Sequence, residues 1–261
     1  MTSSLEKQGP VPNSDYLKGR RLRVFAGPNG SGKTTIFKQI AEKFDIGYYI
    51  NADELEIQLV NTKQVELTPF GLTDLQPSEF EHFQHGHSIL QKATQSGFRL
   101  NLSYSIEQNS IINLNQSLGT YSYEAALIAD FLRIKLIERG KKLTFETVMS
   151  HSSKLDIFRY AADNGYRVYL YFVCTQSADI NVARVCQRVG QGGHDVMEEK
   201  IRKRYLSCLQ LLKPAVKNTF RSFIWDNSQL TPELILEVEN GQVVTQISET
   251  LPNWVEEFLL E

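Results

Sequence analysis

Residues 27–34 read Gly27-Pro28-Asn29-Gly30-Ser31-Gly32-Lys33-Thr34 and are followed by Thr35, so they match the pattern G-x-x-x-x-G-K-[ST]. Glycines at the first, fourth and sixth positions let backbone N–H groups turn inward around phosphate oxygens. Lys33 can reach the β- and γ-phosphates of a nucleotide, and the Thr34 hydroxyl is placed to ligate Mg²⁺. The stretch therefore predicts a nucleotide-binding loop over residues 27–35.

The segments on either side of the loop support this interpretation. Arg21–Gly27 is apolar and predicts a strand, and Thr34–Phe44 has the spacing of an amphipathic helix. A helix that begins at the loop offers its positive end to the same phosphate. The alternative, a glycine-rich turn that binds no nucleotide, is the weaker interpretation in this strand–loop–helix context.

Four further short runs of β-branched and aromatic residues follow the loop. They alternate with helical stretches, as in βαβ units, and their continuous apolar character is typical of strands covered on both faces. The predicted fold class is α/β, a P-loop NTPase or kinase core whose mostly parallel five-stranded sheet is flanked by helices. The five strands are expected at Arg21–Gly27, Tyr48–Asp53, Lys142–Thr147, Arg167–Cys174 and Arg221–Asp226.

The remaining segments suggest one domain with additions. Residues 1–18 are polar and predict a flexible tail, and residues 19–261 predict a single domain. A helical insertion is expected at about 61–140, with one helix capped at Ser78 and another from about Tyr123 to Arg139. A small β-hairpin around Asn240-Gly241 and a short helix are expected at about 232–261.

Composition excludes several classes of protein. The chain has 261 residues, 41% of them hydrophobic, and a net charge of −2, which argues against a disordered or fibrous protein. No apolar run approaches the length of a membrane helix. The three cysteines, Cys174, Cys186 and Cys208, are expected to be free, buried thiols, so we expect a cytoplasmic protein that does not bind membranes.

Charge is unevenly distributed along the chain. The near-zero total argues against a sequence-independent nucleic-acid binder. Between Arg184 and Arg221, however, nine lysines and arginines face three acidic residues, a local charge of +6 in a chain whose remainder carries −8. Such a segment should face an anion, and a nucleotide triphosphate fits it.

Two carboxylates are expected beside the loop. Asp53 and Glu146 each end a predicted strand, and ligands bind at the carboxyl ends of such strands. One carboxylate can accept the proton of an attacking hydroxyl, while the other holds metal-bound water. The alternatives are an N-cap of a helix 54–60 for Asp53 and an ordinary strand-end residue for Glu146. The LSGGQ signature of transport ATPases and the N-K-x-D motif of GTPases are missing from the sequence.

A lid is expected at about 184–204. Arg184 and Arg188 share one face of a predicted helix, and a Gly-Gly-His loop separates them from a second cationic helix. Such helices could bring guanidinium groups onto a transferring phosphoryl group. The alternative is a solvated basic face.

The succession GPNGSGKTT, INADE, FETVMSHSSKLDIFRYAADNGYRVYLYFV, NVARVCQRVGQGGHDV and EEKIRKRY resembles the zeta toxin family of P-loop kinases over about residues 21–228, apart from the insertion. The resemblance implies transfer of the ATP γ-phosphate to a small hydroxyl compound. The best-known toxins act on UDP-N-acetylglucosamine and are held inactive by a small helical antitoxin. An antitoxin partner is therefore implied, whereas the acceptor does not carry over because the insertion covers its pocket.

The resemblance also implies roles for individual residues. Lys33 and Thr34 would bind nucleotide and Mg²⁺, Asp53 would be the general base, and Glu146 the acid near metal or substrate. Arg184 or Arg188 would be the transition-state arginine, and Asn227 would lie near the adenine. The second lid arginine of the toxins falls at or near His194, so the candidates for that contact are His194, Arg202 and Arg204.

The function predicted from the sequence is thus an ATP- and Mg²⁺-dependent phosphotransferase that acts on a hydroxyl of a small molecule, with a UDP-sugar as one candidate. Two alternatives stay open: a nucleic-acid-end or metabolite kinase, and an ATP-binding module without catalysis. The cluster His82, His85 and His87 is expected to be a solvated helix face instead of a metal site. The aromatic residues Phe80, Phe83, Tyr121 and Tyr123 are expected to pack the inserted helices.

Overall fold

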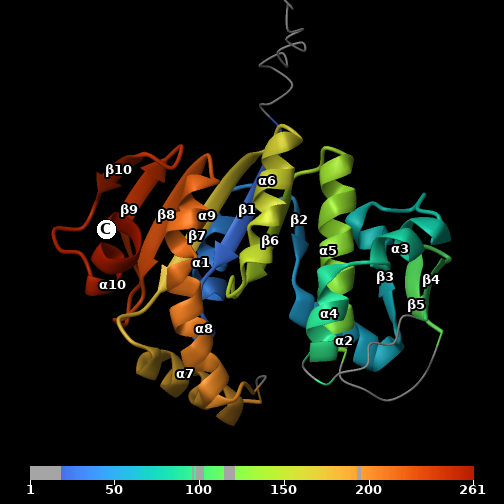
Figure 1. Cartoon of the computed structure of the whole chain (residues 1–261), viewed down its shortest axis with the longest axis horizontal. Helices are drawn as coiled ribbons and strands as arrows, with labels where there is room; N and C mark the ends of the chain where they lie inside the picture. Colours follow the sequence, from blue (N-terminus) through green and yellow to red (C-terminus); the bar gives the residue numbers. More distant parts are fainter. Residues whose placement is uncertain (1–18, 96, 98–102, 115–120, 193–194) are drawn as a thin grey trace, which may run out of the picture.

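The core of the computed structural model is a seven-stranded sheet in the order β10-β9-β8-β7-β1-β6-β2 (Figure 1). The structure describes residues 19–95, 97, 103–114, 121–192 and 195–261, so the expected tail lies outside it. Strands β8, β7, β1, β6 and β2 are parallel, and β9 and β10 are antiparallel. The bounds are β1 Arg21–Ala26, β2 Tyr48–Ile50, β6 Leu143–Thr147, β7 Arg167–Cys174, β8 Arg221–Asp226, β9 Glu233–Glu239 and β10 Val243–Gln246.

The five predicted parallel strands are confirmed, with two differences in their surroundings. The C-terminal hairpin extends the main sheet through pairing of β9 with β8, because the edge of β8 would otherwise present unpaired backbone groups. Strand β2 does not lie beside β1, because β6 pairs with both of them. Glu146 on β6 is therefore the carboxylate beside the loop strand, directly opposite Phe25 in the register.

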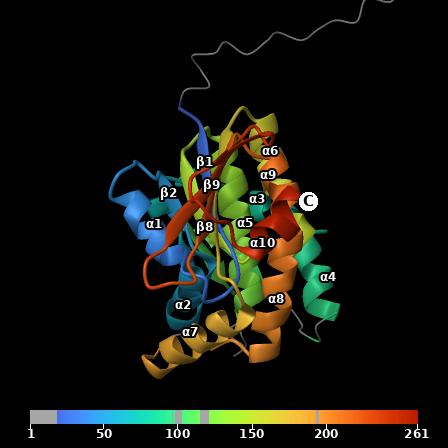
Figure 2. The same cartoon turned by 90° about the vertical axis from the view of Figure 1, so that its left-hand side faces the viewer.

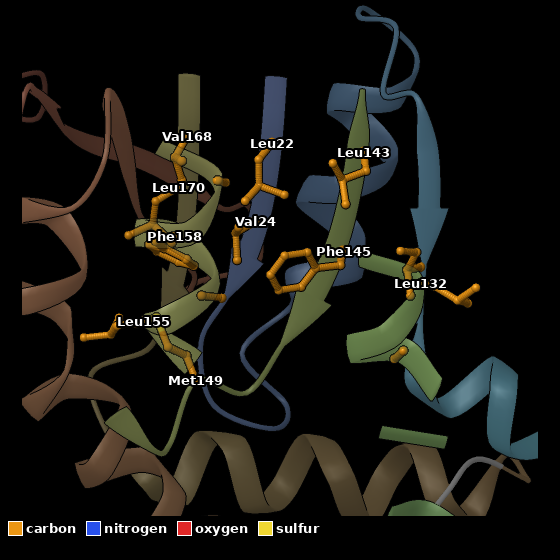
Figure 3. Packing of buried hydrophobic residues seen from close by; sticks show 14 of the residues in the cluster. Leu22, Val24, Leu132, Leu143, Phe145, Met149, Leu155, Phe158, Val168 and Leu170 are labelled. Carbon is orange, nitrogen blue, oxygen red and sulfur yellow. The ribbon is translucent and has the colours of Figure 1, made fainter. Parts of the chain in front are cut away.

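Both faces of the sheet are covered, as the apolar strands predicted. Along β7, alternate side chains enter two separate cores, with Leu170 and Phe172 in the larger one and Tyr171 and Val173 in the smaller one. Helix α1 (Lys33–Ala41) covers the smaller core, and Figure 2 shows α5, α6 and α9 on the opposite side. Figure 3 shows the larger core where β1, β6 and β7 meet α6 and α5.

The other helices of the main domain lie at the carboxyl ends of the strands or against the larger core. Helix α2 follows β2 directly, and α7 lies beyond the carboxyl ends of the strands (Figure 1). Among the described residues, no helix combines the length and apolar character needed to cross a membrane. The bounds are α2 Ala52–Thr62, α5 Ser122–Glu138, α6 Asp156–Asp163, α7 Ala178–Gly190, α8 Glu198–Gln210, α9 Leu212–Lys217 and α10 Asn253–Val255, followed by a π-helical turn at Glu256–Leu260.

The insertion contains the two expected helical regions and, in addition, a small antiparallel sheet in the order β3-β5-β4. The first helical region is divided at Gly86 into α3 (Pro77–Gln84) and α4 (Ser88–Gln95), and α3 is capped by Gln76 instead of Ser78. Long helix α5 packs against α2, α3 and α4 and joins the insertion to the core. The strands are β3 Gln64–Glu66, β4 Tyr104–Glu107 and β5 Ser110–Asn113.

Several expectations about single residues are settled by the packing. Phe80 and Phe83 both contact Phe131 of α5, which confirms their packing role. The imidazole of His82 lies 2.6 Å from the Ser78 carbonyl, whereas His87 faces Asp130 at 3.8 Å. Tyr121 is buried and Tyr123 packs at the edge of the larger core. Of the three free cysteines, Cys174 and Cys208 are buried, but Cys186 is exposed, because it lies on the solvent side of α7.

Candidate nucleotide and phosphoryl-transfer site

The loop between β1 and α1 wraps around its own lysine. Lys33 Nζ donates hydrogen bonds to the carbonyls of Gly27 and Pro28, each at 2.9 Å. Gly27, Gly30 and Gly32 all have positive φ, which side chains rarely adopt. At Gly30 a Cβ atom would lie 2.5 Å from the carbonyl oxygen of Asn181 on α7, so the loop also needs glycine for close packing. Thr35 is exposed in the first turn of α1.

The charges around Lys33 show which groups converge on the loop. Burial lowers the pKa of Lys33, and the nearby carboxylates of Glu146 and Asp53 partly offset that effect. Arg188 lies close enough to lower the same pKa further. The structure therefore brings Lys33, Asp53, Glu146 and Arg188 into one electrostatic neighbourhood, although these residues come from four different elements.

Both carboxylate oxygens of Glu146 have partners at the end of the loop. Oε2 accepts a hydrogen bond from Thr34 Oγ1 at 3.1 Å, and Oε1 accepts one from the Tyr49 hydroxyl at 2.7 Å. A threonine hydroxyl and a carboxylate held side by side are hard oxygen ligands of the kind that Mg²⁺ takes, with water completing its shell. Thr34 and Glu146 therefore fit a magnesium ion bound beside the nucleotide phosphates.

Asp53 lies in the first turn of α2, so it neither ends a strand nor caps the helix. The cap is Asn51, whose Oδ1 accepts a hydrogen bond from the Asp53 backbone N–H at 3.0 Å. The strand ends early because this cap starts the helix at Ala52. The Asp53 side chain is exposed; burial lowers the pKa of both Lys33 and Arg204, and the Asp53 charge partly offsets that effect on each. It thus faces the loop from the far side of β6.

Tyr49 and Asn51 are further residues of the candidate site, which the sequence pattern did not indicate. Asn51 Nδ2 donates to the Tyr49 hydroxyl at 3.2 Å, and the Tyr49 ring stacks on Phe37 of α1 with centroids 4.3 Å apart. Burial and the Glu146 carboxylate both raise the pKa of Tyr49, so the hydroxyl stays protonated and donates to Glu146. The only signal in the sequence was two polar groups near the end of a strand.

The loop after β8 is hydrogen-bonded to the nucleotide loop. Asn227 is buried, and its Nδ2 donates to the Ser31 carbonyl at 2.8 Å. Arg184 donates to the backbone carbonyls of Asn227 at 2.7 Å and Gln229 at 3.2 Å. The guanidinium of Arg184 thus holds the loop after β8, whereas Arg188, one turn farther along α7, lies near Lys33.

The expected lid consists of α7 and α8, and its arginines differ in their surroundings. Arg204 donates to Asn29 Oδ1 at 3.0 Å and therefore reaches the nucleotide loop. Arg202 is exposed and forms ion pairs with Asp179 at 2.7 Å and Glu198 at 2.8 Å, so its charge is paired with carboxylates of α7 and α8. His194 lies outside the described residues. Arg188 and Arg204 are the two arginines that this arrangement brings to the loop.

Comparison with known proteins shows the fold. No family model matches the chain. A chain of the PezAT chromosomal toxin–antitoxin system of Streptococcus pneumoniae superposes with a TM-score of 0.51 at 14% identity, covering 93% of this chain and 79% of that one. A chain of the AvrRxo1-ORF1:-ORF2 complex gives 0.50 at 12% identity, covering 89% and 63%. The chain therefore has the zeta toxin-like P-loop kinase fold that its motifs resemble.

One curated relative matches part of the sequence. It is an uncharacterized protein of Haemophilus influenzae, 33% identical over 60 residues, which is 23% of this chain. The match spans 43% of that protein, less than half of its length.

Proposed function

We propose that the protein is an ATP- and Mg²⁺-dependent kinase that transfers the ATP γ-phosphate to a hydroxyl group of a small molecule. The observation that carries this proposal is the placement of Glu146. Its carboxylate lies against Thr34 at the mouth of the nucleotide loop, with Lys33 on one side and Asp53 across β6. A binding module without catalysis would not need a second carboxylate facing the loop lysine.

Each residue has a distinct task in the proposed reaction. Asp53 accepts the proton of the acceptor hydroxyl as its oxygen attacks the γ-phosphorus and the bond to the β-phosphate oxygen breaks. Lys33 leaves the carbonyls of Gly27 and Pro28 and binds the β- and γ-phosphates. Arg188 and Arg204 neutralise charge on the transferring group. Thr34 and Glu146 would hold Mg²⁺, which would supply charge neutralisation for the nucleotide phosphates.

The proposal also covers the partner protein, the acceptor and the cellular location. Because one structural relative belongs to a toxin–antitoxin system, we include an antitoxin protein as a partner in the proposal. A UDP-sugar is one acceptor to test, and the cytoplasm is the proposed location. Asn227 and the loop after β8 are the proposed neighbours of the adenine.

The experiment that tests this function follows labelled phosphate. The protein is incubated with Mg²⁺, γ-labelled ATP and a small-molecule cell extract, and labelled products are separated by chromatography. Labelled product should form with the wild-type chain and with Asp45→Ala, an exposed aspartate bonded to Lys142. It should be lost in Lys33→Ala and Asp53→Ala. Transfer at the wild-type rate by Asp53→Ala would remove Asp53 as the base, and nucleotide binding without any labelled product would favour the non-catalytic module.

A further inference from the structure

A group of cationic side chains lies outside the nucleotide site, on the segment that follows β6. Residues Ser152–Lys154 form a 3₁₀ turn, and Lys92 of α4 reaches it from the insertion. Lys92 Nζ donates to Ser153 Oγ at 2.8 Å and lies 3.2 Å from His151 Nδ1. Lys154 Nζ lies 3.8 Å from Asp130 Oδ2 on α5. We refer to Lys92, His151, Ser153 and Lys154 as the cationic cluster.

The hydrogen bonds of the His151 ring show which of its nitrogens is the donor. Its Nδ1 accepts a hydrogen bond from the Ser153 backbone N–H at 3.2 Å, which caps the 3₁₀ turn. Since Nδ1 is the acceptor, the proton of the neutral ring is on Nε2. Burial and the charges of Lys92 and Lys154 lower the pKa of His151, which favours this neutral form. The cluster thus offers two ammonium groups and an imidazole N–H.

The charges of the cluster do not balance. Asp130 is bound by the buried guanidinium of Arg133, and Asp156, the other carboxylate near Lys92, is bound by Arg159. Lys92, Lys154, Arg133 and Arg159 carry four positive charges against the two negative charges of Asp130 and Asp156, which leaves a local charge of +2. Burial lowers the pKa of Lys154; the Asp130 carboxylate partly offsets this effect, and the approach of Arg133 and Lys92 adds to it. Residues 96–102 and 115–120 contain no acidic side chain that could supply the missing charge. Half-buried cations in such a setting are stabilised by an anion.

The cluster follows the carboxyl end of β6, the strand that carries Glu146. His151 lies five positions after Glu146, so the chain places them at most roughly 18 Å apart. Met149 has a left-handed φ of 51° although it is buried and not glycine. Figure 3 shows Met149 and Leu155 in the core at the two ends of the segment. A strained turn held by core packing is a device that fixes side chains at functional sites.

The lid also contacts this segment. The Cys208 thiol of α8 donates to the Val148 carbonyl, and Arg204 on the same helix reaches Asn29 of the nucleotide loop. The segment after Glu146 therefore runs between the nucleotide loop, the lid and the insertion. The cationic cluster is therefore joined to Glu146 by one short stretch of chain.

We propose that the cationic cluster binds a phosphate monoester group of the acceptor, and hence that the acceptor is a phosphorylated small molecule with a free hydroxyl. A monoester carries close to two negative charges at pH 7, which matches the local excess of two positive charges, and its three terminal oxygens match the ammonium and imidazole donors. A carboxylate would neutralise only one of the charges. This inference rests on the proposed kinase function for the role of the bound molecule, but not for its binding.

Binding can be measured without catalysis. The nucleotide loop is first saturated with Mg²⁺ and a non-hydrolysable ATP analogue, and inorganic phosphate is then titrated in a calorimeter, with acetate as the singly charged comparison. Phosphate should bind to one further site, and acetate much more weakly. Lys92→Met should weaken phosphate binding about tenfold, the loss expected for a hydrogen bond to a charged group. The matched control is Lys142→Met, which removes an exposed lysine paired with Asp45.

The outcomes separate the two proposals. Phosphate binding that is absent after saturation of the loop, unchanged in Lys92→Met, or equalled by acetate would overturn the inference. Lys154→Met removes the other lysine of the cluster and should also weaken phosphate binding. Because Lys154 is half-buried, this variant can fail to fold, and Ser153→Ala then takes its place in the titration. If phosphate binds as expected but no labelled product ever forms from ATP, the proposed kinase function fails while the anion site stands.

Discussion

The hydroxyl of Tyr49 and the carboxylate of Glu146 are 2.7 Å apart, although 97 residues separate them in the sequence. The hydrogen bond joins the edge strand β2 to β6, and Asn51 extends it toward the first turn of α2, where Asp53 lies. The proposed metal carboxylate and the proposed base are therefore positioned by one chain of hydrogen bonds.

Tyr49→Phe tests this positioning. The variant keeps the ring that stacks on Phe37 and removes only the hydroxyl, so Glu146 loses one of its two partners. We expect the Mg²⁺ concentration for half-maximal activity to rise about tenfold, the effect of losing a hydrogen bond to a charged group. Mn²⁺ binding, followed by electron paramagnetic resonance, should weaken in parallel. Tyr160→Phe, whose exposed hydroxyl lies 3.4 Å from Glu138, is the control and should leave both values unchanged.

Gly30→Ala and Gly86→Ala form a matched pair. The two glycines have nearly equal φ values of 76° and 79°, but a Cβ at Gly30 would lie 2.5 Å from the Asn181 carbonyl, whereas one at Gly86 would meet nothing within 4 Å. Gly86→Ala should cost about 1 kcal/mol of unfolding free energy, from backbone strain alone. Gly30→Ala should also displace the loop and abolish ATP binding, as measured by calorimetry. Equal effects of the two substitutions on ATP binding would contradict the close packing of the loop on α7.

Asn227→Ala removes the amide that holds the Ser31 carbonyl from below. Because Asn227 is buried, we expect a loss of about 1–3 kcal/mol in the free energy of unfolding, measured with urea. ATP affinity should fall as well, since the loop loses its support. Asn218→Ala breaks a comparable bond, 2.8 Å to the Pro214 carbonyl, at an exposed site, and it should change stability much less and ATP affinity not at all.

Lys92→Met should raise the pKa of His151. Burial and the two nearby lysines hold that pKa below the ordinary histidine value, and removing one cation makes the protonated ring less costly. The ring resonances of His151 in an NMR titration report the change directly. Lys142→Met, at the far end of the sheet, should leave the pKa of His151 at its wild-type value. A pKa that falls or stays constant in Lys92→Met would show that the cluster is not assembled as described.

The parts of the fold that follow from local patterns could be predicted. The strands at residues 167–174 and 221–226 agree with the structure at both ends, because each centres on large apolar and aromatic side chains and is buried on at least one face. The β3-β5-β4 sheet was not foreseen, because its strands have only three or four residues and include Gln64, Glu66 and Asn113. Strands of that length are fixed by their partners and by packing against α2 and α3, which the local sequence does not reveal.

The candidate site divides in the same way. The nucleotide loop was predicted because its chemistry depends on spacing within eight residues. The roles of Tyr49 and Asn51 depend on Glu146, and the difference between Arg184 and Arg204 depends on which distant carbonyl or amide each guanidinium meets. The start of α2 at Ala52 moved Asp53 from a strand end into a helix, because the capping strength of Asn51 outweighed the apolar run before it.

The two arginine contacts of the lid also limit how it can move. Arg184 fixes α7 to the loop after β8, and Arg204 fixes α8 to Asn29 of the nucleotide loop. Each of the two helices is thus held to a loop at the floor of the site by one guanidinium group, so a motion of α7 or α8 away from the nucleotide loop must first break that hydrogen bond.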